Sequence, residues 1–167
     1  MANTLAPSPP LLQAQPGVDA VTVVIDTNVL LDLWVFANPG VLALLEALNR
    51  GELRWLATAT MRTELEHTLA KPSLAPWRPD PDKVLGQFDR LSTCTPAPAP
   101  TAVPRLCCRD PKDQMFIDLA LAHRAPWLIS HDRALLALAR QARMFGVAVV
   151  RPAQWQTPAS TSTSTPD

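Results

Sequence analysis

The sequence has no excess of charge of either sign, because 15 basic residues balance 15 acidic residues over 167 positions. A strong basic excess is the simplest signal of nucleic-acid binding, and it is missing here, although a local basic face is not excluded. Cysteine is scarce as well: Cys94, Cys107 and Cys108 are odd in number, two are adjacent, and no CxxC pair occurs. This pattern indicates neither a disulfide framework nor a zinc site, and it favours a reducing compartment.

Long hydrophobic runs are also lacking. No apolar stretch approaches the roughly 18 residues that a membrane-spanning helix needs. The first residues, MANTLAPSPPLLQAQPG, have neither the basic n-region nor the long apolar h-region of a signal peptide. We therefore expect no association with a membrane and a cytoplasmic location.

Proline is abundant but unevenly distributed. The 18 prolines are frequent in the first 17 residues and in the internal stretch TPAPAPTAVP (95–104), while the last residues form a Ser/Thr tract. The two ends contain too little apolar surface to offset the entropy of ordering them. We predict disordered tails at residues 1–19 and 154–167, a single domain at residues 20–153, and a loop within that domain at residues 95–104.

Between the tails, short uncharged strands alternate with segments of helical periodicity, a pattern typical of parallel strands that helices cover on both faces. We predict an α/β fold, a three-layer α/β/α sandwich with a central parallel sheet of four to five strands. The strands are expected at residues 21–26, 53–56, 127–130 and 147–150, and the helices at residues 28–36, 41–49, 60–70, 81–91, 112–124 and 133–143.

Four acidic residues lie where this fold would bring them toward one edge of the sheet. Asp26 directly follows the first predicted strand, and Asp132 follows the strand at residues 127–130. Glu64 lies within a predicted helix, and Asp113 lies at the start of another. Ligands of open α/β sheets bind beyond the carboxyl ends of the strands, where Asp26 and Asp132 are expected. Asp113 and Asp132, with Ser130, also suit an ordinary helix-capping role.

Acidic side chains that gather at one place have a distinct chemistry. Carboxylates that lie close together raise one another's pKa unless a cation compensates their charge. Oxygen donors without His or Cys suit Mg²⁺ or Mn²⁺, and such ions activate water and neutralise charge on a phosphodiester. An all-carboxylate site therefore favours phosphoryl chemistry over acyl transfer or redox chemistry.

The stretches VIDTNVLLDLW, TELEHTLAKPSL and DPKDQMFIDLALAHRAPWLISHDRALL together resemble the PIN-domain family in order, spacing and flanking residues. The resemblance covers about residues 21–150 and is strongest to the bacterial subgroup described as toxin components of toxin–antitoxin systems. It implies a Mg²⁺- or Mn²⁺-dependent endoribonuclease with RNA as its substrate. It also implies a protein antitoxin as partner, and a homodimer is left open.

The resemblance further implies roles for individual residues. The four acids match the family's catalytic and metal-site positions one by one: Asp26, Glu64, Asp113 and Asp132. Asn28 matches the position that supports the first acid, and Ser130 matches the small hydroxyl residue that is common before the last acid. The chain departs from its relatives at His131, where Gly is frequent, and this side chain either adds a phosphate contact or crowds the site.

The residues also bear on two alternative functions. A PIN fold that acts as a binding or scaffolding module with little turnover is the alternative function, although such a module has no need for four repelling carboxylates. A haloacid-dehalogenase-type phosphatase would need a second Asp two residues after the first, and this position is Asn28. Five basic residues lie near the acidic stretches and form either phosphate contacts or a solvated rim: Arg62, Arg105, Arg109, Lys112 and Arg133.

Overall fold

The computed structural model describes residues 17, 19–100 and 106–156. Its centre is a five-stranded sheet of order β3-β2-β1-β4-β5, in which all neighbouring strands are parallel. The strands are β1 (Val21–Ile25), β2 (Leu53–Ala57), β3 (Ser92–Cys94), β4 (Trp127–Ile129) and β5 (Ala148–Val150). In the central strand, Val23 lies opposite Trp55 of β2 and Trp127 of β4.

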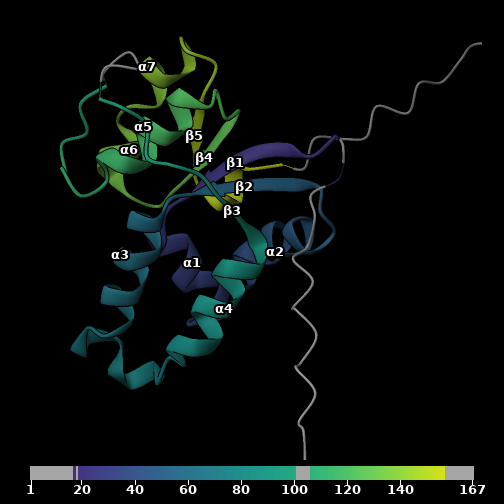
Figure 1. Cartoon of the computed structure of the whole chain (residues 1–167), viewed down its shortest axis with the longest axis vertical. Helices are drawn as coiled ribbons and strands as arrows, with labels where there is room; N and C mark the ends of the chain where they lie inside the picture. The colour runs from purple at the N-terminus through teal and green to yellow at the C-terminus, as the bar shows by residue number, and fades with distance from the viewer. Residues whose placement is uncertain (1–16, 18, 101–105, 157–167) are drawn as a thin grey trace, which may run out of the picture.

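Helices cover both faces of this sheet, as Figure 1 shows. On one side lie α1 (Thr27–Trp34), α2 (Leu42–Asn49), α3 (Ala59–Leu69) and α4 (Pro81–Leu91), and on the other lie α5 (Gln114–Ala122), α6 (Arg133–Leu136) and α7 (Ala139–Arg143). Three 3₁₀ helices complete the fold: Pro39–Val41, Pro72–Trp77 and Pro152–Gln154. The predicted α/β/α sandwich is confirmed.

The helices of residues 17, 19–100 and 106–156 are short. No single helix there is long and apolar enough to cross a bilayer. The helical segments Thr27–Trp34 and Pro39–Asn49 meet the length and composition required only when they are taken together, across a bend of 115°.

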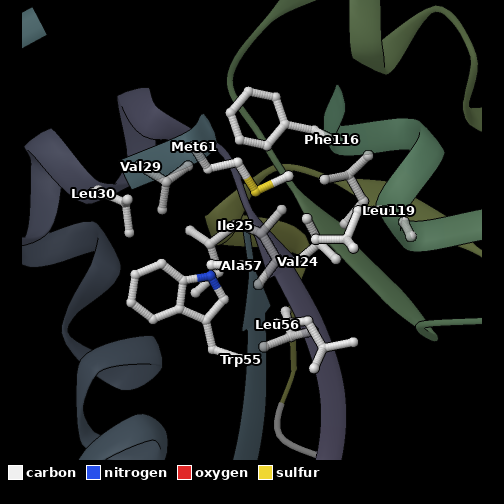
Figure 2. Packing of buried hydrophobic residues seen from close by; sticks show 14 of the residues in the cluster. Val24, Ile25, Val29, Leu30, Trp55, Leu56, Ala57, Met61, Phe116 and Leu119 are labelled. Atoms are coloured by element: carbon white, nitrogen blue, oxygen red, sulfur yellow. The ribbon is translucent and has the colours of Figure 1, made fainter. Parts of the chain in front are cut away.

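The core explains why the central strand carries no charge. Val23, Val24 and Ile25 are each at most 1% exposed, as expected for a parallel strand that is covered on both faces. Figure 2 shows Met61 of α3 and Phe116 of α5 pointing toward one another beside Ile25. This packing lies next to the carboxyl end of β1, so it holds the starts of α3 and α5 near the residue that follows the strand.

Two elements differ from those predicted. The short edge strand β3 was not expected, because Ser92 and Thr93 are polar and the segment follows a helix directly. The helix predicted at residues 133–143 is broken into α6 and α7. The backbone tightens where the N–H of Leu138 donates to the carbonyl of Leu135, only three residues earlier, and both leucines are buried.

The predicted tails lie for the most part outside the described residues. At the carboxyl end, Trp155 is 6% exposed and packs into the hydrophobic core. The bounds of the domain and of its tails stay a prediction.

Candidate active site

Asp26 lies one residue beyond β1 and is the most deeply buried acid of the site, with 2% of its surface exposed. Its N–H donates to the carbonyl of Ile129 at 3.0 Å, which continues the hydrogen bonding between β1 and β4 past the end of the strand. The Asp26 side chain is therefore held at the carboxyl edge of the sheet by the sheet itself.

Ser130 joins the ends of the two neighbouring strands. Its hydroxyl is fully buried and donates to Oδ2 of Asp26 at 2.7 Å. The same Oγ accepts the N–H of Asp132 at 2.9 Å. One small side chain thus fixes the carboxylate that follows β1 and the backbone of the acid that follows β4.

Asp132 is the N-cap of α6. Its Oδ1 accepts the N–H groups of Ala134 at 2.6 Å and Leu135 at 3.2 Å. The capping role considered for this residue is therefore real. Because both bonds use the same oxygen, they also fix the orientation of the half-buried carboxylate.

Glu64 comes from α3, whose first turn is capped by Thr58 through a 3.3 Å bond from the N–H of Met61. The buried hydroxyl of Thr27 donates to Oε2 of Glu64 at 2.9 Å. Thr27 begins α1 directly after Asp26, so this bond ties the α3 acid to the end of β1. The role of Thr27 was missed from the sequence, although it lies within the DTN stretch that drew attention to its neighbours.

Asp113 is the N-cap residue of α5, but its side chain makes no capping hydrogen bond. Burial, helped by the negative charges of Asp26 and Asp132, raises the pKa of its half-buried carboxyl to about 7. Burial likewise raises the pKa of Asp26 to about 6, against the opposing effect of the Ser130 hydrogen bond. These are the carboxyl groups that would gain most from a neighbouring cation.

One hollow of about 250 Å³ brings the predicted acids together. It is lined by Asp26, Thr27, Asn28, Glu64, Thr68, Lys71, Asp110, Lys112, Asp113 and Asp132. The exposed Asn28 lies in the first turn of α1, at the rim, while Ser130 is buried behind the lining. Asp110 and Lys71 were not predicted as part of the site, whereas Lys112 was considered as a phosphate contact or a solvated rim residue.

Comparison with known proteins now decides the family. The sequence model of the PIN-domain family matches residues 22–134, which is most of the chain and includes all four acids. The chain belongs to the PIN-domain family. No curated protein matches it significantly. PIN domains are in general metal-dependent nucleases.

The donor set of this PIN domain fits a hard divalent cation in chemical type, since it consists of carboxylates without His or Cys. Among the described residues, however, no three His, Cys, Asp or Glu side chains lie close enough together to form a metal site. The four residues share a hollow without forming a ligand cluster there. Their assignment as metal ligands stays a prediction.

His131, where the family resemblance led us to expect Gly, does not line the hollow. Its Nε2 lies 2.7 Å from Oδ2 of Asp32 in α1. His131 therefore connects the turn between β4 and α6 to helix α1. The two roles considered for it, a phosphate contact or crowding of the site, find no support in this position.

Proposed function

We propose that this PIN domain is a Mg²⁺- or Mn²⁺-dependent endoribonuclease that hydrolyses RNA phosphodiester bonds, with Asp26, Glu64, Asp113 and Asp132 as its metal ligands. The observation that carries the proposal is the single hollow that these four carboxylates line at the carboxyl edge of the sheet. When bound there, the cation would neutralise charge on the phosphodiester and activate water for in-line attack.

The chain's own hydrogen bonds support this role by orienting three of the carboxylates. Asp26 is held by Ser130, Glu64 by Thr27, and Asp132 by two backbone N–H groups, each through a single oxygen. Side chains fixed in this way lose little entropy when they bind a cation. Asn28, at the rim, is available to orient the RNA or a water molecule.

The first experiment measures cleavage of a mixed pool of structured and single-stranded RNA in Mg²⁺, in Mn²⁺ and in EDTA. We expect cleavage in both metals and none in EDTA. Asp26→Asn and Glu64→Gln should each reduce the rate by at least about 100-fold, because each removes a ligand charge.

Glu66→Gln is the matched control, because Glu66 is exposed on the same helix and does not line the hollow. Its rate should equal that of the wild type. Absence of cleavage by folded, partner-free wild-type protein in every condition would reject the nuclease and favour the binding or scaffolding module.

The resemblance to toxin components extends the proposal to biology. We infer that the protein is the toxin of a toxin–antitoxin pair in the cytoplasm, silenced by a protein antitoxin, with a homodimer as a further possibility. Expression of the wild type alone should arrest growth, whereas Asp26→Asn should not. Equal growth of cells expressing either protein would contradict the toxin role.

A further inference from the structure

A second hollow of about 450 Å³ adjoins the carboxylate hollow. It is lined by Arg109, Asp110, Pro111, Asp132, Arg133, Ala134 and Ala137. Asp110 and Asp132 line both hollows, so the two share a border. The character of the surface changes across that border, from a wall dominated by carboxylates to one that carries two guanidinium groups.

The guanidinium groups of Arg109 and Arg133 are exposed, and neither forms an ion pair with a carboxylate in the part of the chain that the structure describes. Each of the two bordering acids has one carboxylate oxygen in hydrogen bonds to the backbone. Oδ1 of Asp110 accepts the N–H of Lys112 at 2.9 Å, and Oδ1 of Asp132 caps α6. The hollow thus carries two guanidinium groups and two carboxylates that do not pair with one another, so the guanidinium groups are available to a ligand.

The part of the sequence that follows Asp132 is also rich in arginine. Residues 133–156 contain Arg133, Arg140, Arg143 and Arg151 and no acidic residue. All charged residues of this segment are therefore basic, and the first of them, Arg133, lines the second hollow. A polyanion in the second hollow would therefore find two guanidinium groups next to the border with the carboxylate hollow.

We propose that the hollow of Arg109 and Arg133 binds the phosphodiester next to the scissile one in a single-stranded RNA. This inference rests on the proposed nuclease function, because it takes the carboxylate hollow as the place of cleavage. Planar guanidinium groups match phosphate oxygens in geometry as well as in charge. A flexible single strand can bend to place successive phosphates in two adjoining hollows, whereas a duplex holds its backbone on a fixed convex path.

The loop that carries Arg109 is held in place before any ligand binds. The side chain of Gln114, the first residue of α5, accepts the N–H of Cys108 and donates to the carbonyl of Leu106, each at 2.7 Å. Arg133 is the first residue of α6, directly after its cap. Both guanidinium groups therefore project from anchored backbone, which lowers the entropic cost of binding a phosphate.

The test measures binding rather than cleavage, so it does not depend on turnover. In an Asp26→Asn background at constant Mg²⁺, a short fluorescent single-stranded RNA is titrated over a range of KCl concentrations. Arg109→Gln and Arg133→Gln should each weaken binding and reduce the slope of log K against log salt by about 0.7, the value for one lost phosphate contact on a single strand.

Arg124→Gln is the matched control, because it removes the same charge at a distant place. Arg124 lies three residues before β4, at the amino end of the strand and away from both hollows. It should leave the salt slope unchanged. The proposal would be overturned if Arg109→Gln and Arg133→Gln had the same slope of log K against log salt as the parent. It would also be overturned if the two substitutions changed this slope as much for a duplex RNA as for the single strand. Failure of the nuclease itself is recognised separately, by the cleavage assay with wild-type protein.

Discussion

At the scale of single residues, Ser130 connects two of the site's acidic residues. It is fully buried, and its one oxygen atom serves both as donor to Asp26 and as acceptor for the N–H of Asp132. A buried carboxylate without such a partner is costly, because desolvation is not repaid by hydrogen bonding. The DTN and SHD stretches of the sequence are therefore joined physically through this hydroxyl.

Ser130→Ala tests that connection. We expect the free energy of unfolding in EDTA at pH 8 to fall by about 1–3 kcal/mol, since a buried acceptor and a backbone donor lose their partner. Metal affinity, measured as the Mg²⁺ dependence of cleavage, should fall by about 10- to 100-fold, because the Asp26 ligand is no longer oriented.

The control for this variant is Ser73→Ala, at an exposed position in the 3₁₀ helix Pro72–Trp77. It should change stability by less than about 0.5 kcal/mol. If Ser130→Ala behaved like this control in urea unfolding and in metal dependence, the orienting role of Ser130 would be wrong.

At the scale of elements, the start of α5 organises the loop that borders the two hollows. Gln114 bonds to the backbone at Cys108 and Leu106, and its Nε2 also donates to Oδ1 of Asp118 at 2.8 Å. The loop therefore moves with the helix that carries Asp113 at its N-cap. This arrangement explains how a segment without regular structure can present Arg109 and Asp110 at fixed positions.

Gln114→Ala should release the loop while leaving α5 folded. Exchange of the Cys108 amide hydrogen should accelerate by roughly 2- to 10-fold, which corresponds to the net free energy of a typical hydrogen bond. The KM for RNA should rise more than kcat falls, because the loop positions a binding group. Gln141→Ala, on the exposed part of α7, is the matched control and should alter neither quantity. An unchanged exchange rate at Cys108 would contradict the anchoring role.

At the scale of the whole molecule, the acidic hollow makes stability depend on pH in the absence of metal. The pKa of Asp26 is raised by burial from 3.8 to about 6, and that of Asp113 from 3.8 to about 7. Between pH 4 and pH 7 the unfolded chain thus loses protons that the folded chain still holds. Because the folded state then binds more protons, its stability must fall as the pH rises through this range.

We therefore expect the free energy of unfolding in EDTA to decrease between pH 4.5 and pH 7.5, with Asp26 contributing at most about 3 kcal/mol. Addition of Mg²⁺ at pH 7.5 should raise the melting temperature, because the cation binds only the folded state. Thermal unfolding followed by circular dichroism over this pH range provides the measurement.

Asp26→Asn separates this effect from other titrating groups. The variant cannot ionise at position 26, so its stability should vary less with pH than that of the wild type. Glu66→Gln should retain the full dependence, because that exposed residue lies outside the hollow. A wild-type stability that rises from pH 4.5 to pH 7.5 in EDTA would contradict the raised pKa values.

The sequence by itself determined the sheet of parallel strands and the segments that carry the acids. The uncharged run at Val21–Ile25 specifies a buried strand, and the acid directly after it must lie at the strand's carboxyl end. Asp132, three residues beyond the end of Trp127–Ile129, is placed at the same edge of the sheet by the same signal. These local signals depend only on the spacing of hydrophobic residues along the chain and on where each strand ends. They placed the predicted elements within a few residues.

Only the tertiary structure decided which side chains share the hollow and what state they are in. The bond from Thr27 to Glu64 joins residues 37 positions apart, and that from Ser130 to Asp26 joins residues 104 positions apart. The raised pKa values follow from burial, and burial is a property of the packed chain. The strand β3 and the break between α6 and α7 were decided in the same way, because pairing with β2 and the burial of Leu135 and Leu138 outweigh weak local preferences.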